Sequence, residues 1–373
     1  MSRSLYLRPI GLAAVPDRSR IDEVRGCLPL AGSRHLDFTG VEVIERTAGK
    51  GAGASGVSLR TTSIGELNET DWGRNASVVS EFFNALVMPR PAIAALPMNR
   101  TYIMGIVNVT PDSFSDGGRH ATTQAAIDHA LRLEDAGADI LDIGGESTRP
   151  GAAPVTLDEE LRRVLPVIEG LRQRAGARLS IDTRTAEVMR RAAQAGVEII
   201  NDVSALSHDP ASLEAAAASK LPVILMHALG DPRTMQADPT YGHVLLDVFD
   251  YLEQRIAAAE AAGIARSRLI VDPGIGFGKT VTHNLQLLGG VALFHSLGVP
   301  ILIGASRKRF IGTITGIETA ADRLAGSLAT MLAAVAQGVQ LVRVHDAAAS
   351  VQALAMWQAI EAQRAPATTL ATS

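Results

Sequence analysis

The sequence predicts a (β/α)8 barrel, the TIM-barrel fold, preceded by a small α+β N-terminal segment. From about residue 100, short apolar runs alternate eight times with helix-like stretches, which is typical of a parallel sheet whose strands are joined by helices. The chain from that point to its end has the usual length of such a barrel. Aromatic residues make up only 4% of the chain, which favours a helix-rich α/β protein over a β-sandwich.

The composition excludes several classes of protein. Of the 373 residues, 47% are hydrophobic and 20% are charged, which allows a large core and argues against extensive disorder. The net charge is −4 and no block of basic residues occurs, so we expect no nucleic-acid partner. No apolar run is long enough to cross a bilayer, so we expect no membrane partner. The single cysteine, Cys27, excludes an intramolecular disulfide, as is typical of a reducing compartment, and we expect a cytoplasmic protein.

Residues 1–95 lack the rhythm of the rest of the chain. Residues 5–10, 41–44 and 57–64 have β-like patterns, and a Gly-rich loop lies between the last two of them. Residues 76–87 form one expected helix, after which several prolines break the pattern. We therefore expect an α+β extension over 1–95 that carries no catalytic constellation and whose role is open.

The barrel is expected over residues 99–365, followed by a disordered tail over 366–373. The eight expected strands are residues 102–107, 140–143, 179–181, 199–203, 223–226, 269–271, 301–304 and 341–344. The expected helices are residues 122–136, 157–174, 186–195, 211–218, 245–262, 283–297, 318–337 and 346–364. A doubly wound open sheet would call for a Gly-rich phosphate turn after an early strand, and the sequence has none.

Polar or ionisable side chains lie at or just after the carboxyl end of every expected strand. In chain order they are Asn108, Asp142, Asp182, Asn201, His227 after Met226, Asp272, Lys308 after Ser306, and His345 after Arg343. Singly, each has an ordinary structural explanation, since an Asp at a strand–helix junction is more often a helix N-cap than a catalyst. The carboxyl ends of all eight strands face one pocket in this fold, so we interpret the whole set as a binding site.

The chemistry of these residues falls into two kinds. Acceptor-rich Asp142, Asp182, Asn201 and Asp272 suit a flat heterocycle that presents N–H donors, because a guanidine-like edge can donate two hydrogen bonds to one carboxylate. The last two strands are the usual phosphate side of the fold, and they carry cationic or potentially cationic side chains. These are Lys308, Arg343 and His345. The pattern indicates a pocket for a ring that bears a phosphorylated arm.

Asn108 is the expected metal ligand. It follows the first strand, which lies beside the eighth when the barrel closes, so its amide oxygen can share the bound anion. A neutral amide oxygen together with water and phosphate oxygens suits Mg²⁺.

Several of these residues lie within motifs that resemble those of the dihydropteroate synthase family. The stretch 108–118 reads Asn-Val-Thr-Pro-Asp-Ser-Phe-Ser-Asp-Gly-Gly, and 142–151 reads Asp-Ile-Gly-Gly-Glu-Ser-Thr-Arg-Pro-Gly; both are similar to the family's long signatures. The family's remaining motifs are matched in order at 181–183, 200–202, 272–279, 306–308 and 343–346. The similarity runs from about residue 101 to 364 and leaves the first 95 residues uncovered.

The resemblance implies the condensation of 6-hydroxymethyl-7,8-dihydropterin diphosphate with p-aminobenzoate, giving dihydropteroate and pyrophosphate. It implies that the pterin ring is held by Asp182, Asn201, Asp272 and Lys308, with Asp142 and Met226 beside it. It places the diphosphate on Arg343 and His345, with Mg²⁺ on Asn108, and the p-aminobenzoate pocket on Thr148, Arg149, Pro150, Phe277 and Ser306. It also implies a homodimer and competition by sulfonamides, which mimic p-aminobenzoate.

The physical logic of that reaction agrees with the residues. Pyrophosphate is a good leaving group once Mg²⁺ and cations neutralise it, so C–O cleavage can run ahead of attack in an SN1-like step. The aniline amine then needs no strong general base, and catalysis rests on charge and positioning. The first loop, with Asp112 and Asp116, is expected to close over the reacting centre, and we expect one of these aspartates to stabilise the cation.

Two alternatives share much of this pattern. A pterin-binding methyltransferase that passes a methyl group from methyltetrahydrofolate to a corrinoid protein has the same fold and pterin-facing residues, but it has no need for Arg343 and His345. A non-catalytic pterin-binding paralogue that works through its N-terminal segment would be expected to have lost some polar strand ends, whereas every motif above is intact.

Overall fold

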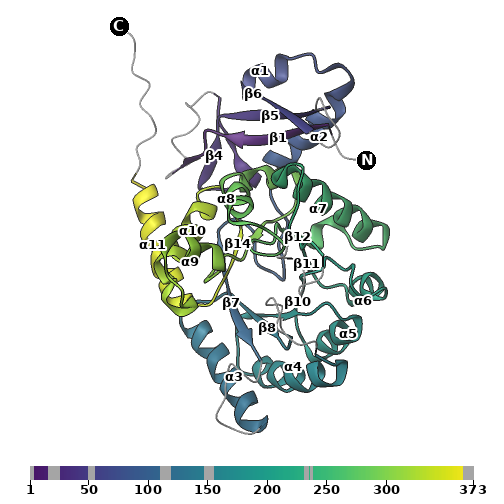
Figure 1. Ribbon diagram of the computed structural model, residues 1–373, viewed down its shortest axis with the longest axis vertical. Coiled ribbons are helices and arrows are strands. Elements are labelled where there is room, and N and C mark those ends of the chain that lie inside the picture. Colours follow the sequence, from purple (N-terminus) through teal and green to yellow (C-terminus); the bar gives the residue numbers. More distant parts are fainter. Residues whose placement is uncertain are drawn as a thin grey trace.

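Eight parallel strands form one closed sheet in the computed structural model, which describes residues 4–15, 26–48, 55–109, 119–146, 155–230, 235 and 238–363. The strands are β7 (Tyr102–Asn108), β8 (Ile140–Gly144), β9 (Arg178–Asp182), β10 (Ile199–Asp202), β11 (Val223–Met226), β12 (Leu269–Asp272), β13 (Leu302–Ile303) and β14 (Leu341–Val344). They pair in chain order from β7 to β12, β14 lies between β7 and β13, and the bridge between Val271 and Ile301 closes the ring. The predicted (β/α)8 barrel is confirmed (Figure 1).

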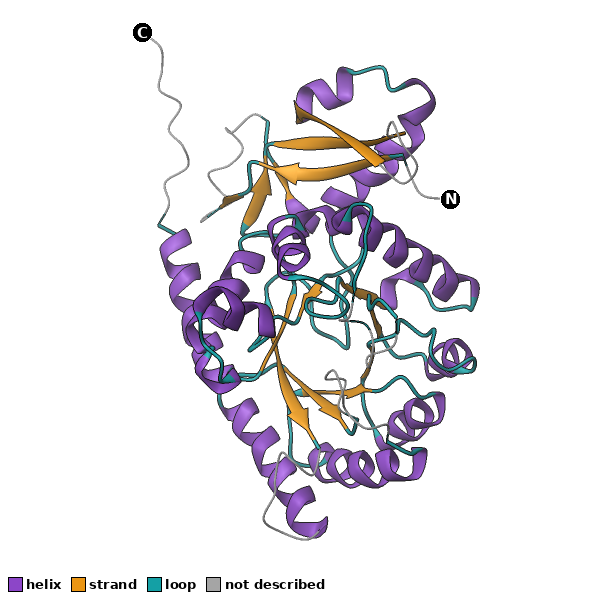
Figure 2. Ribbon diagram, in the orientation of Figure 1, coloured by secondary structure: helices purple, strands orange, loops and turns teal. Residues whose placement is uncertain are grey.

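Helices surround the sheet on its outer side (Figure 2). They are α3 (Arg119–Asp135), α4 (Leu157–Arg172), α5 (Ala186–Ala195), α6 (Ser212–Ser219), α7 (Val244–Ala261), α8 (Val281–Gly289), α9 (Arg309–Thr315), α10 (Leu324–Val335) and α11 (Ala347–Glu361). Local signals set their ends: the Thr156 side chain accepts a hydrogen bond from the Glu159 N–H at the start of α4, and Gly196, at φ 109°, ends α5. None of the described helices is long and apolar enough to span a membrane.

Two of the predicted helices are divided in the structure. The helix expected over 283–297 ends at Gly289, and a 3-10 helix, η6 (Val291–Leu297), follows, because adjacent glycines at 289 and 290 favour helix poorly. The range 318–337 contains a 3-10 helix, η7 (Ala320–Asp322), followed by α10, and the short α9 before it was not predicted. Seven residues that end at Gly316, at φ 74°, give too little periodicity for a prediction.

The amino-terminal end of the barrel is closed by apolar side chains. Ile140, Ile199, Ile224 and Ile270, near the beginnings of their strands, are fully buried in one cluster. Ile93, from the Pro-containing stretch before β7, belongs to the same cluster and is also fully buried. Because this end is packed, substrates must enter from the other end, where the strands finish.

The N-terminal segment is a compact α+β layer that packs against α7 and η6 of the barrel (Figure 1). A three-stranded antiparallel sheet contains β1 (Leu5–Ile10), β5 (Gly40–Ala48) and β6 (Ser55–Ser63), and a smaller sheet contains β2 (Ala13–Ala14), β3 (Leu28–Pro29) and β4 (Leu36–Phe38). Two helices complete it, α1 (Ile64–Glu69) and α2 (Ala76–Val87). The strands and the helix predicted here are confirmed, whereas the expected tail 366–373 lies outside the described residues.

Aromatic packing joins this layer to the barrel. Tyr6 and Phe82 both meet the ring of Phe249 edge-on, at centroid distances of 5.4 and 5.7 Å. Arg90 donates to the carbonyl oxygens of Ala85 and His295, which links the end of α2 to η6. The segment is therefore packed against the outer helices of the barrel.

Candidate active site

An arginine and two aspartates from separate strands meet at the carboxyl end of the barrel. Arg343 on β14 reaches across to β8 and β9: its Nε donates to Asp142 Oδ2 at 2.6 Å and its Nη2 to Asp182 Oδ2 at 2.8 Å. Asn201 on β10 donates its amide N–H to the same Asp142 oxygen at 3.0 Å. The structure thus brings together four residues that the sequence predicted for the site.

Asp142 is the most deeply placed of these groups. Its side chain is 0% exposed, and its Oδ1 has no hydrogen-bond partner among the described residues. Leaving a buried carboxylate oxygen unpaired is unfavourable, so such an atom is expected to accept a donor from a ligand. This atom is the strongest single indication of a binding site at the rim.

Burial also changes the acidity of the neighbouring aspartates. It raises the pKa of Asp182 to about 7, against the opposing attraction of Arg343 and with a further increase from Asp142. It raises the pKa of Asp272 to about 6, although the Gly274 N–H and the nearby lysines act in the opposite direction. Two carboxyl groups that titrate near neutral pH at one rim are typical of a functional site.

Arg343 was predicted to bind a diphosphate, and it lies against the carboxylates predicted for the ring. Its position compensates the charge of Asp142 and Asp182, which would otherwise repel each other in a buried environment. The guanidinium therefore lies between the aspartates predicted to bind the ring and the part of the rim predicted to bind the diphosphate. Its role toward a diphosphate stays a prediction.

Two glycines shape the loop after β12, because each adopts a positive φ at which any other residue would be strained. A Cβ on Gly274, at φ 68°, would lie 1.9 Å from the carbonyl oxygen of His227. A Cβ on Gly276, at φ 84°, would lie 3.0 Å from the Lys308 side chain. This close approach lets the Phe277 ring lie 3.9 Å from Lys308 Nζ, a cation–π contact. Two predicted residues, Phe277 and Lys308, are therefore neighbours.

Lys279, at the end of the same loop, was not assigned a role from the sequence. It is 4% exposed, and its Nζ lies 2.9 Å from His227 Nδ1 and 3.0 Å from the Phe277 carbonyl oxygen. Burial lowers the pKa of Lys279 to about 7. The lysine anchors the loop to the end of β11, and its position as the last residue of the Gly-rich motif was the available signal.

The remaining predicted residues lie around the same rim. Ser306 Oγ is 3.1 Å from His345 Nδ1 and accepts a hydrogen bond from the His345 N–H. Burial, together with Arg307 and Arg343, lowers the pKa of His345 to about 3, so its imidazole is neutral here. Met226 is buried at the end of β11, and Asn108 is partly buried at the end of β7. Among the described residues no group of three His, Cys, Asp or Glu side chains forms a metal site.

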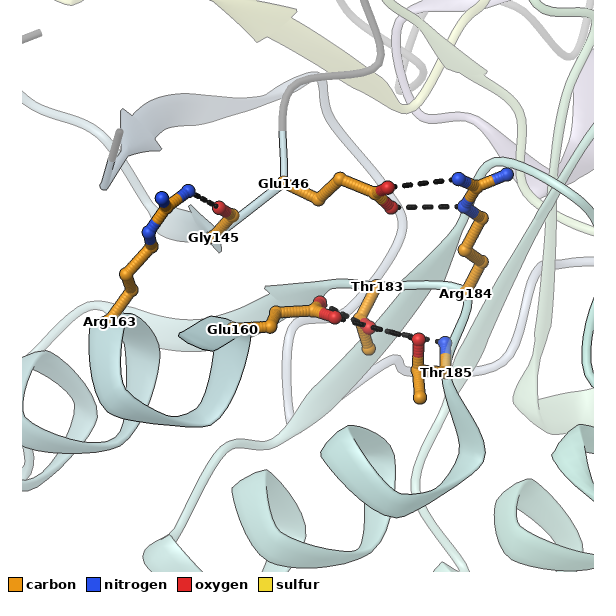
Figure 3. A network of polar contacts seen from close by, with 7 residues as sticks. All are labelled: Gly145, Glu146, Glu160, Arg163, Thr183, Arg184 and Thr185. Atoms are coloured by element: carbon orange, nitrogen blue, oxygen red, sulfur yellow. Dashed lines mark hydrogen bonds and ion pairs between the residues drawn. The ribbon is translucent and has the colours of Figure 1, made fainter. Parts of the chain in front are cut away.

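A polar network fixes the stem of the second signature loop (Figure 3). Glu146 accepts two hydrogen bonds from Arg184, both at 2.9 Å, and Arg163 donates to the Gly145 carbonyl oxygen at 2.8 Å. Below them, Thr183 donates to Glu160 at 2.6 Å. These contacts hold the end of β8 just before residues 147–154. Within that stretch, the predicted Thr148, Arg149 and Pro150 lie outside the described residues, as do Asp112 and Asp116 in the first loop.

A cavity of about 490 Å³ lies elsewhere, at the closed end of the barrel. It is bounded by the N-terminal segment, by residues that precede β7, including Met98, and by Trp357 of α11. None of the carboxylates or cations described above lines it. The predicted site residues therefore lie at the rim, and this cavity is a separate feature of the fold.

Comparison with known proteins identifies the family. Residues 104–345 match the profile of the pterin-binding enzymes. The dihydropteroate synthase of Escherichia coli K12 is 48% identical over 265 residues, which is 71% of this chain and 93% of the relative. The chain belongs to the dihydropteroate synthase family.

Solved dihydropteroate synthases have the same fold. The Xanthomonas albilineans enzyme solved with 4-aminobenzoic acid is 52% identical, with a TM-score of 0.70, over 74% of this chain and 99% of its own. The same enzyme solved with 7,8-dihydropteroate gives 50% identity and a TM-score of 0.67, over 74% of this chain and 100% of its own. These synthases are matched over almost their full length, yet each covers only about three quarters of this chain.

Membership of the dihydropteroate synthase family confirms the resemblance and makes this chain a transferase. The relatives carry the name of the synthase, and neither the methyltransferase nor the non-catalytic alternative receives support from them. The roles of the individual site residues in the reaction are proposals.

Proposed function

We propose that this rim condenses 6-hydroxymethyl-7,8-dihydropterin diphosphate with p-aminobenzoate, giving 7,8-dihydropteroate and pyrophosphate. The observation that carries the proposal is the buried, half-satisfied carboxylate of Asp142 beside Asn201, Asp182 and Arg343. The N–H edge of the pterin ring would complete its hydrogen bonding and that of Asp182 and Asp272. Lys308, which lies against Phe277, would contact the pterin ring, and Met226 would pack beside the same ring.

Charge neutralisation at the anion side would drive C–O cleavage. Arg343 and Lys308 are cations within one rim, and a pyrophosphate that leaves beside them is stabilised more than the intact ester. The neutral His345 imidazole and the Ser306 hydroxyl would offer polar contacts without net charge. Because the leaving group departs before the amine attacks, the amine needs positioning more than deprotonation. We infer that Phe277 and Ser306, with Thr148, Arg149 and Pro150, shape the pocket that positions it.

Asn108 fits Mg²⁺ only as part of a complex with the substrate. The described residues offer one neutral amide oxygen there and no carboxylate cluster, so they provide no protein cage for a free ion. Mg²⁺ commonly keeps most of its waters and binds with substrate phosphates, and such an ion needs few protein ligands. When bound, Mg²⁺ would neutralise charge on the leaving diphosphate. The homodimer remains a prediction from the resemblance, and the cytoplasmic location remains a prediction from the sequence.

Pyrophosphate release tests the proposed reaction. The enzyme, mixed with dihydropterin diphosphate, p-aminobenzoate and Mg²⁺, should release pyrophosphate only when both organic substrates are present. A coupled phosphate assay with single-omission controls measures this. Binding of the pterin without turnover would instead favour the non-catalytic paralogue, and transfer of a methyl group from methyltetrahydrofolate would favour the methyltransferase.

Binding of the dihydropterin diphosphate should release protons near pH 6. The pKa of Asp182 is raised to about 7 and that of Asp272 to about 6, so the free enzyme holds part of these protons at that pH. Donors on the ring favour the charged carboxylates and lower both pKa values, which expels the protons. The release should fall toward zero at pH 8, where both groups are already ionised. Calorimetric titrations in buffers of different ionisation enthalpy measure it, and Asp182→Asn should reduce it; proton uptake at pH 6 would contradict the assignment.

A further inference from the structure

The N-terminal segment contacts the outer helix α7 through a partly buried cluster of charged and polar side chains. Arg46 of β5 donates from Nη2 to Asp247 Oδ1 at 2.7 Å, and the same nitrogen lies 3.3 Å from Asp250 Oδ2. Its Nε donates to the Tyr6 hydroxyl at 2.9 Å, and that hydroxyl donates to Asp250 at 2.9 Å. The Arg46 side chain is only 16% exposed. Two strands of the segment are thereby tied to one helix of the barrel.

The contact falls on the first turn of α7, at the end of the barrel where the active site lies. The second oxygen of Asp247 accepts a hydrogen bond from the His243 N–H at 3.0 Å, and the Asp247 N–H donates to the His243 carbonyl oxygen at 2.9 Å. The carboxylate that Arg46 orients therefore also fixes the backbone at the start of the helix. The His243 side chain makes no capping hydrogen bond, so the Asp247 carboxylate satisfies one of the free N–H groups at this helix end.

Tyr241, two residues before His243, reaches the loop after β12, residues 273–279, which we call the substrate loop. Its hydroxyl donates to the Gly278 carbonyl oxygen at 2.8 Å, and its ring meets that of His283 edge-on at a centroid distance of 5.0 Å. Gly278 is at φ 62°, and a Cβ there would lie 2.6 Å from Leu229. It directly follows Phe277, whose ring contacts Lys308. The hydrogen bond from Tyr241 thus holds the loop that the pterin and p-aminobenzoate would contact.

We propose that the N-terminal segment is a brace for the substrate loop, with Arg46 and Tyr241 as positioning residues. Arg46 fixes the first turn of α7, this turn fixes Tyr241, and Tyr241 holds the Gly278 carbonyl and with it the Phe277–Lys308 pair. The inference rests on the proposed reaction at this rim. The synthases compared above are matched almost completely by about three quarters of this chain, and the family match begins at residue 104, so the brace is an addition to the matched barrel.

Arg46→Met tests the brace, because methionine keeps much of the length and removes the charge. We expect the KM for dihydropterin diphosphate to rise roughly three- to tenfold with a smaller change in kcat, since the loop binds substrate less well when it is loosened. Tyr241→Phe should have the same effect. The double variant should be no worse than the poorer single variant, because both changes break one path. Arg46→Lys should recover part of the loss.

Arg8→Met is the matched control. Arg8 is an arginine of the same sheet whose ion pair, 2.6 Å to Glu42, stays within the segment, so the variant should keep the wild-type KM. Amide hydrogen exchange over residues 272–280 gives a readout that needs no turnover, and it should rise in Arg46→Met and not in Arg8→Met. If wild-type enzyme releases no pyrophosphate, the reaction is wrong, and exchange still tests the brace. An unchanged KM and exchange in Arg46→Met, equal effects in Arg8→Met, or additive effects in the double variant would overturn the brace.

Discussion

Arg343→Met should lower kcat/KM by about 100-fold or more, because the variant loses a preorganised cation beside the developing pyrophosphate. It should also destabilise the fold by about 3 kcal/mol at pH 8, because two carboxylates that share one arginine become uncompensated in a buried position. Chemical denaturation and steady-state kinetics on the same preparation measure the two losses.

The loss of stability should depend on pH in a defined direction. Burial already raises the pKa of Asp182 to about 7 in the intact site, so the folded state holds a proton that the unfolded state has released. Ionising Asp182 therefore costs stability as the pH rises from about 4 through 7. Without Arg343 the pKa rises further, so the variant should lose more stability at pH 8 than at pH 5, where the carboxyl stays protonated and neutral.

Arg178→Met is the control for this prediction. Arg178 lies at the opposite end of strand β9 from Asp182 and pairs with Glu198 at 2.7 Å, with both side chains more than a third exposed. An exposed pair contributes about 0–1 kcal/mol, so this variant should keep its activity and most of its stability at both pH values. Wild-type stability in Arg343→Met, or a loss of equal size at pH 5 and pH 8, would show that Arg343 does not compensate the charges of Asp142 and Asp182.

Lys308→Ala should lower kcat/KM for dihydropterin diphosphate by about 100-fold, and most of the effect should come from weaker pterin binding. Lys308 lies against the Phe277 ring, and its charge opposes that of buried Lys279, whose pKa it lowers. Removing Lys308 relieves this repulsion but also removes its attraction for the Asp272 carboxylate, and because the two effects oppose each other, the free energy of unfolding should change by less than about 1 kcal/mol. Calorimetric binding of the pterin substrate and thermal unfolding measure the two quantities separately.

Arg309→Ala is the matched control for Lys308→Ala. Arg309 is the next residue in the chain, is cationic and is exposed at the start of α9. Its replacement should leave both binding and stability near the wild-type values. Parallel losses of melting temperature and activity in Lys308→Ala would indicate that Lys308 is a structural residue.

Much of the fold was predictable because the signals are local. Apolar runs of strand length and helical periodicity placed β7 and α5 within a residue of their observed bounds, and Gly196 supplied the left-handed residue that ends α5. The predictions were wrong where the local helix signal was weak. At Gly289 the helix gives way to η6, and after Lys308 the seven-residue α9 is too short for its pattern to be recognised.

The sequence by itself determined the architecture, the family and the end of the barrel at which the chemistry lies. It could do so because the polar residues recur at the carboxyl end of each strand in a repeated strand–helix unit. In this fold the carboxyl ends of all eight strands lie at a single rim. The order of residues along the chain is enough for that inference.

Only the tertiary structure decided which charged side chains form ion pairs. Arg343 and Asp142 are 201 positions apart, as are Arg46 and Asp247, and no local pattern relates them. The direction of a long side chain and the burial that raises the pKa of Asp182 depend on all the elements that meet at a point. For that reason the pairing of Arg343 with the ring-side aspartates, the anchor of Lys279 and the brace from the N-terminal segment became visible only in three dimensions.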